Sequence, residues 1–105
     1  FEFQGGNENF FHTYYTFPIL ITENAHFTRR ELCEYLELNN IETRPLFAGC
    51  LPDQPAFKNQ PGRSFGNLEN SRYIRDNLFF VGIHPHLKSY HVQFIAKTII
   101  SFVKK

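Results

Sequence analysis

The sequence has 105 residues, enough for one domain around one core, and its 42% hydrophobic and 17% aromatic residues favour a packed core over disorder. The formal net charge is +1 and the charged residues are dispersed, so a nucleic-acid partner is not expected. No apolar run approaches the roughly 20 residues that span a bilayer, so no membrane partner is expected either. The two cysteines, Cys33 and Cys50, are too few for a disulfide scaffold and are expected to be free thiols in a cytoplasmic protein.

The beginning of the chain predicts a short lead-in followed by a strand. Residues 1–9 are polar and Gly-rich and are expected to be flexible, so that the folded domain covers 10–105. Aromatic and β-branched residues over 10–21, alternating in the later part, predict a strand, and Pro18 indicates an edge position or a bulge. The sequence contains no Met, so we expect residue 1 to be a processed terminus or a cut that isolates a domain.

A helix is expected over 28–39. Thr28 and Glu31 have the spacing of a capping box, in which each side chain accepts a hydrogen bond from the backbone of the other residue. Apolar residues then follow at i, i+3 and i+4. Asn39-Asn40 can end the helix, because Asn tolerates the left-handed conformation.

The second half of the chain combines a long loop with further strands and helices. Gly and Pro punctuate the loop, and a loop of this length is often functional. A continuous apolar run predicts a strand buried on both faces, and an apolar stripe predicts the last helix. In chain order we expect a strand over 41–47 that Arg44-Pro45 confines to an edge or ends early, a loop over 48–68 with a helical turn at 53–57, a helix over 69–77, a strand over 78–83, and a helix from Lys88 or Ser89 to 104. The predicted fold is α+β: a small three-stranded sheet with two to three helices packed on it.

No motif of a catalytic nucleophile, metal centre or phosphate loop stands in the sequence: GxSxG, HExxH, GxGxxG and the P-loop are absent. His84 and His86 are two residues apart and could share a metal, but no CxxC or HxxxH pattern accompanies them. A turn at the end of a strand explains both histidines. We therefore expect no metal site and no catalytic residue in this chain, which is not expected to be active alone.

One segment of the sequence suggests a binding site. Glu42 and Arg44 occupy alternate positions of the strand expected over 41–47, so both side chains should face the same way. An Arg guanidinium can bind a phosphate through two hydrogen bonds, and a Glu carboxylate can accept hydrogen bonds from sugar hydroxyls. A surface ion pair between the two residues is the alternative interpretation.

The segment 41–57 resembles a known family. Its run Ile-Glu-Thr-Arg-Pro-Leu-Phe-Ala-Gly over 41–49, followed by Gln-Pro-Ala-Phe over 54–57, is similar to the pattern TR-x-L-F-A-G-N-L-x-x-Q-P-x-F in the C-terminal domain of the DegT/DnrJ/EryC1/StrS sugar aminotransferases. Within that family it resembles the nucleotide-sugar 3-dehydrases, which act on 4-keto-6-deoxyhexoses. The resemblance covers roughly residues 10–104 and departs from the pattern at Cys50, where the family usually has Asn.

The resemblance implies the C-terminal small domain of a fold-type I pyridoxal-phosphate enzyme whose large domain is absent from this sequence. In such enzymes the large domain carries pyridoxal or pyridoxamine phosphate, with a Lys in aminotransferases or a His in 3-dehydrases beside it. The small domain closes over the substrate, so the resemblance implies that Glu42, Arg44, Phe47 and Gln54 bind the nucleotide sugar. The parent enzyme is then expected to be a cytoplasmic homodimer in deoxysugar and lipopolysaccharide O-antigen biosynthesis.

Two other functions stay open. The same small domain occurs in nucleotide-sugar aminotransferases, which leave the amine on the sugar, whereas the dehydrases expel the C3 hydroxyl. A stand-alone α+β binding module with no catalytic activity is also compatible with the dispersed charge and the absent motifs. An apolar surface patch larger than several hundred Å² would favour a domain that docks on a larger partner.

Overall fold

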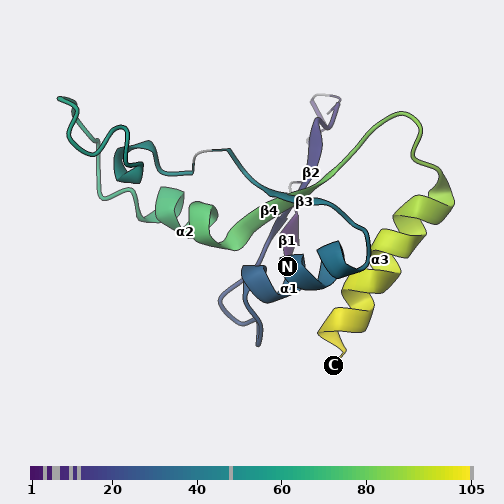
Figure 1. Cartoon of the computed structure of the whole chain (residues 1–105). Coiled ribbons are helices and arrows are strands. Elements are labelled where there is room, and N and C mark those ends of the chain that lie inside the picture. Colours follow the sequence, from purple (N-terminus) through teal and green to yellow (C-terminus); the bar gives the residue numbers. More distant parts are fainter. Residues whose placement is uncertain (4, 6–7, 10, 12, 48, 105) are drawn as a thin grey trace.

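The computed structural model describes residues 1–3, 5, 8–9, 11, 13–47 and 49–104 (Figure 1). The helices expected over 28–39, 69–77 and 88–104 are all present. The turn expected at 53–57 is present as a hydrogen-bonded turn at the Gln54 carbonyl, directly after a short 3₁₀ helix, η1 (Leu51–Asp53). None of the helices in the described ranges combines the length and apolarity needed to cross a membrane. The elements are β1 (Glu2–Phe3), β2 (Thr16–Leu20), α1 (Arg29–Leu38), β3 (Thr43–Pro45), η1 (Leu51–Asp53), α2 (Glu69–Asn77), β4 (Leu78–Gly82) and α3 (Ser89–Val103).

The strands form one antiparallel sheet in the order β1-β2-β4-β3. The α+β prediction is confirmed, but the sheet has one strand more than expected. Glu2 and Phe3, which belong to the lead-in expected to be flexible, form the added strand β1 by pairing with Leu20 and Ile19 of β2. The ring centroids of Phe3 and Phe17 lie 5.5 Å apart, and this aromatic contact stabilises β1. A strand of two residues is too short to show the alternation by which strands are predicted.

The two prolines of the sheet differ in position, one in an edge strand and one in an interior strand. Pro45 ends β3, an edge strand that pairs with β4, as expected from the sequence. Pro18 lies in β2, between β1 and β4, and pairs with Phe80 of β4. The edge expected for Pro45 is therefore confirmed, whereas the edge expected for Pro18 is wrong, because the added strand β1 makes β2 an interior strand.

The core lies between one face of the sheet and α1, with α3 alongside α1 (Figure 1). Ile19 of β2 pairs with Phe79 of β4, and both are buried against Leu32 and Leu36 of α1. The neighbouring positions of β4 face the other side of the sheet and are only half-buried, so β4 alternates rather than being buried on both faces as its apolar run suggested. The other members of the core cluster are Ile21, Ile41 and Val81.

Both ends of α1 are those predicted from the sequence. Thr28 is the N-cap: its Oγ1 accepts from the N–H of Glu31 at 3.3 Å, and Glu31 Oε2 accepts from the N–H of Thr28 at 2.7 Å. The hydrogen bond from the Thr28 backbone, and after it the one that Thr28 Oγ1 donates to Glu31 Oε2 at 2.8 Å, lower the pKa of Glu31. The helix ends at Leu38, with Asn39 as the C-cap and Asn40 in the left-handed region at a φ of 59°.

Candidate functional site

Glu42 and Arg44 lie at the β3 edge of the sheet. Arg44 is opposite Phe80 of β4, and Glu42 directly precedes β3. Arg44 donates from Nε and Nη2 to Glu42 Oε1, at 2.8 and 2.6 Å. The two side chains thus share a direction, as their alternation predicts, and form the ion pair that was the alternative interpretation. The side chains are 66% and 73% exposed, so a ligand can reach both partners, and the pair by itself contributes little to folding.

Phe47 follows β3 by two residues and combines a strained backbone with an exposed ring. Its φ of 46° lies in the left-handed region, which bulky residues seldom adopt. Its residue surface is 78% exposed, so the strained backbone does not serve packing of the core. Strain of this kind is typical of residues that contact a ligand or another domain.

Gln54 lies at the other end of the loop that leaves β3. It is the C-cap of η1, and its carbonyl accepts hydrogen bonds from the N–H groups of Phe57 at 2.9 Å and Lys58 at 3.0 Å. Figure 1 shows η1, in teal, beside α2 and away from β3. The structure therefore brings Glu42 and Arg44 together but places Gln54 on a separate part of the loop, next to α2.

An ion-pair network that sequence reasoning missed holds η1 against α2. The Asp53 carboxylate accepts from Nε and Nη2 of Arg72 at 2.8 and 2.9 Å, and from Nη1 of Arg75 at 2.6 Å. Arg75 also donates to both carboxylate oxygens of Asp76, at 2.7 and 2.8 Å. A signal for this network exists in the sequence, because arginines at i and i+3 lie on one face of a helix and can receive an acidic residue from a loop.

The network shifts the pKa of each of its members toward the charged form. Hydrogen bonds from Arg72, aided by Arg75, lower the pKa of Asp53 to about 2. The Asp53 carboxylate raises the pKa of Arg72, while Asp76, with Asp53 second, raises that of Arg75. Arg75 in turn lowers the pKa of Asp76. All four groups are charged at neutral pH, so the attraction that anchors the loop is present throughout the physiological range.

Gly49 marks a close contact between the loop and α2. Its φ of 63° is in the left-handed region, and a Cβ built at this position would lie 2.5 Å from Cγ and 2.6 Å from Cβ of Arg75. Behind this contact, Nη1 of Arg29 donates to the carbonyls of Arg75 at 2.8 Å and Leu78 at 3.2 Å, where α2 meets β4. The loop, α2 and β4 are therefore fixed to one another by contacts from three separate segments.

Cys50, where the sequence departs from the family pattern, is buried and is the N-cap of η1. Its side chain makes no capping hydrogen bond. Asn is among the preferred N-cap residues, so the Asn of the family pattern would suit this position for a local reason. The departure therefore bears on the geometry of η1, next to Asp53.

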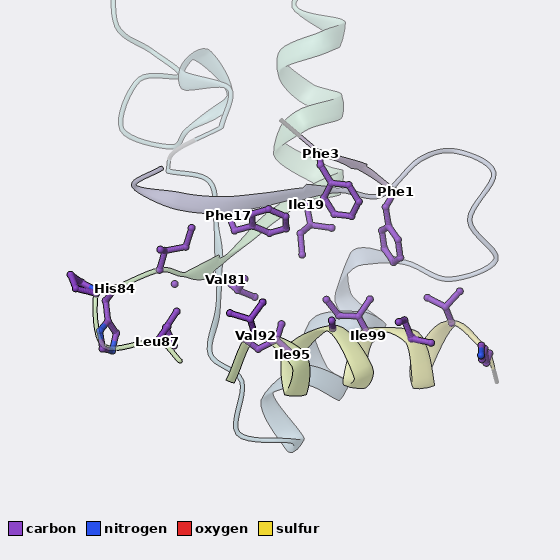
Figure 2. A pocket seen from close by; sticks show the side chains of 17 residues that line it. Phe1, Phe3, Phe17, Ile19, Val81, His84, Leu87, Val92, Ile95 and Ile99 are labelled. Atoms are coloured by element: carbon purple, nitrogen blue, oxygen red, sulfur yellow. The ribbon is translucent and has the colours of Figure 1, made fainter. Parts of the chain in front are cut away.

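The metal-ligating side chains of the described residues are scattered. Within this part of the chain no three His, Cys, Asp or Glu side chains gather around a common point. His84 Nδ1 instead accepts the N–H of His86 at 3.0 Å, in the turn after β4. A cavity of about 850 Å³ lies between the sheet and α3, but its almost entirely apolar lining does not fit the phosphate of pyridoxal phosphate (Figure 2).

Comparison with known proteins shows the family of this chain. The DegT/DnrJ/EryC1/StrS aminotransferase family matches residues 2–100. The chain is 36% identical over 93 residues to dTDP-4-dehydro-2,6-dideoxy-D-glucose 3-dehydratase of Saccharopolyspora spinosa, covering 89% of this chain and 20% of that protein. It is 36% identical over 90 residues to the lipopolysaccharide biosynthesis protein RfbH of Salmonella typhimurium, covering 86% of this chain and 21% of that protein. The chain thus spans about a fifth of the length of these relatives.

Solved structures match the fold. GDP-4-keto-6-deoxy-D-mannose-3-dehydratase of E. coli, with bound hydrated PLP, has a TM-score of 0.72 at 25% identity, covering 80% of this chain and 22% of that one. A mutant of GDP-4-keto-6-deoxymannose-3-dehydratase with bound GDP-perosamine has a TM-score of 0.73 at 25% identity and the same coverage. The matched region is the C-terminal part of these fold-type I enzymes, which confirms the predicted fold. Since the family match runs over nearly the whole chain, this protein belongs to the DegT/DnrJ/EryC1/StrS aminotransferase family.

Proposed function

We propose that this chain is the C-terminal small domain of a pyridoxal-phosphate-dependent nucleotide-sugar 3-dehydrase in deoxysugar and lipopolysaccharide O-antigen biosynthesis. The observation that carries the proposal is the similarity to a 3-dehydratase: the two sequences are 36% identical over 89% of this chain. The aligned region is 20% of the 3-dehydratase. The cofactor and the catalytic residue then belong to a large domain of the same polypeptide. The parent enzyme is a cytoplasmic homodimer, and the present chain contributes substrate contacts.

Glu42 and Arg44 bind the nucleotide sugar in this proposal. Arg44 uses Nε and Nη2 for Glu42, which leaves Nη1 to donate to a phosphate oxygen. Glu42 uses Oε1 for Arg44, which leaves Oε2 to accept from a sugar hydroxyl. The pair therefore offers a substrate one hydrogen-bond donor and one acceptor side by side, while the ion pair between Arg44 and Glu42 stays intact.

The loop after β3 supplies the remaining contacts. The exposed ring of Phe47 offers a flat apolar face on which a nucleobase or sugar can stack. The network around Asp53 fixes η1, and with it Gln54, against α2, so that the loop presents a firm surface to the substrate. When bound in the parent enzyme, pyridoxal phosphate supplies the electron sink for loss of the C3 hydroxyl. Closure of the small domain excludes water from that reaction.

A sugar aminotransferase is the second candidate, since the chain is also 30% identical over 95 residues to dTDP-4-amino-4,6-dideoxy-D-glucose transaminase of E. coli, covering 90% of this chain and 26% of that protein. The coding sequence upstream of Phe1 separates the candidates. A large domain with His at the position beside the cofactor supports the 3-dehydrase, and Lys there supports the aminotransferase. A reading frame that opens just before Phe1 overturns both and leaves the stand-alone binding module.

Alanine substitution in the parent enzyme tests the proposed contacts. Glu42→Ala and Arg44→Ala should each raise KM for the nucleotide sugar, or lower kcat, by about 10- to 100-fold, the loss expected for one charged hydrogen bond. The matched control is Arg30→Ala, because Arg30 also forms an exposed ion pair, with Glu34 on α1, at an N···O distance of 2.7 Å. Kinetic constants unchanged in both site variants, as in the control, would remove Glu42 and Arg44 from the substrate site.

A further inference from the structure

An apolar groove runs between the sheet and α3. Figure 2 shows that side chains from the two sides point toward one another across it. Its volume is about 850 Å³, and His84 and Lys104 are among the residues that line it. The side chains that define its walls are Phe3, Phe17 and Ile19 on the strands and Val92, Ile95 and Ile99 on α3.

Contacts with the core hold the C-terminal half of α3 more closely than its first turn. Phe102, near the C-terminal end of α3, packs against Phe27 and Tyr35, with ring centroids 5.1 and 5.2 Å apart. Toward the other end of α3, Val92 is 54% exposed, and Phe3 across the groove is 56% exposed. Apolar side chains grouped in this way on a water-soluble domain are typical of a surface that another segment covers.

We infer that the groove holds the apolar face of an amphipathic helix of the same polypeptide, from the segment that precedes Phe1 in the parent enzyme; this inference rests on the proposed function. The groove walls offer apolar side chains and scarcely any hydrogen-bonding groups. A strand or an irregular segment placed there would leave its backbone N–H and C=O groups unpaired, whereas a helix pairs its own. The groove therefore suits an amphipathic helix whose apolar face meets α3 and the sheet.

The position of Phe1 points to the upstream segment as the occupant. Phe1 and Phe3 lie on the groove wall, so a polypeptide that leads into residue 1 reaches this domain at the groove. The region matched in the solved relatives is their C-terminal part and amounts to 22% of their length, so most of a parent chain precedes it. A helix from the upstream segment would lie beside β1 and contact both α3 and the sheet.

Photo-cross-linking in the parent enzyme identifies the occupant. p-Benzoylphenylalanine replaces Phe17 in the groove and, as the matched control, Phe94, which lies on α3 outside the groove wall and is 51% exposed. The Phe17 probe should cross-link to one segment upstream of Phe1 within the same chain, and the Phe94 probe should not. Since only contacting atoms react, a cross-link from position 17 reports what fills the groove.

Other outcomes overturn the inference. Cross-links to a second copy, identified by mixing isotope-labelled and unlabelled protein, would make the groove a contact between subunits. Cross-links confined to residues 1–105, or a yield no higher than at Phe94, would mean that no upstream segment lies there. If the enzyme converts its nucleotide sugar under these conditions, only the groove assignment fails. A parent gene with no sequence upstream of Phe1 overturns the proposed function as well.

Discussion

Gly49→Ala tests how closely the long loop is fitted to α2. Two features of the structure oppose a side chain at this position: the left-handed φ of 63°, and the Arg75 side chain, whose Cγ would lie 2.5 Å from the new Cβ. Gly66→Ala is the matched control, because Gly66 has a similar φ of 72° and nothing within 4 Å of a Cβ. The difference between the two variants isolates the contact with Arg75 from the backbone strain.

The magnitudes follow from the two terms. A left-handed residue with a Cβ costs roughly 1–2 kcal/mol, and the lower entropy of the unfolded chain returns about 0.4–1 kcal/mol, equally in both variants. At Gly49 the Arg75 side chain must also move away, and overpacking of this kind costs about 1–3 kcal/mol. We therefore expect Gly66→Ala to lower the free energy of unfolding by about 1 kcal/mol and Gly49→Ala by about 2–4 kcal/mol.

Urea unfolding measures the global effect, and amide hydrogen exchange measures detachment of the loop alone. The N–H groups of Asp53 and Gln54, which donate to Cys50 and Leu51 carbonyls at 3.2 and 3.0 Å, should exchange faster in Gly49→Ala than in Gly66→Ala. Equal unfolding free energies and equal exchange rates in the two variants would refute the close fit between the loop and Arg75.

Three further predictions concern stability. Leu36→Ala removes a fully buried side chain and should cost about 2–5 kcal/mol, whereas Leu38→Ala, at a position 84% exposed on the same helix, should stay within about 0.5 kcal/mol; similar urea midpoints would contradict the packing of α1. Thr28→Ala should lower the free energy of unfolding by about 1 kcal/mol because it removes the N-cap, and Thr28→Ser should keep most of that stability. A loss in Thr28→Ser as large as in Thr28→Ala would count against the cap. Because the folded pKa of Asp53, about 2, lies below its ordinary 3.8, the stability it contributes is present above about pH 4 and is lost as the pH falls toward 2. The stability difference between wild type and Asp53→Asn should shrink over this window, and a difference that does not change with pH argues against the network.

Local signals in the sequence were enough for the helices and the family. The capping box of Thr28 and Glu31 and the left-handed Asn40 fixed both ends of α1, since caps depend on residues within one turn of each other. The motif over 41–57 identified the family because its residues are contiguous in the chain. The alternation of Glu42 and Arg44 predicted their common direction, which the period of a strand imposes.

Contacts between distant residues were decided by the tertiary structure alone. Asp53 meets Arg72 and Arg75 across 19 and 22 residues of sequence. The spacing of the two arginines indicates that they share a helix face, but it does not indicate which acidic residue binds them. β1 forms only because β2 offers a strand for Glu2 and Phe3 to pair with, so their local sequence reads as a polar lead-in. The sequence likewise does not predict the groove beside α3. The residues that line it come from separate strands and a helix, and their apolar pattern is the one expected for core residues. Sequence periodicity gives the apolar face of each element, but which part of that face stays uncovered depends on where the other elements pack.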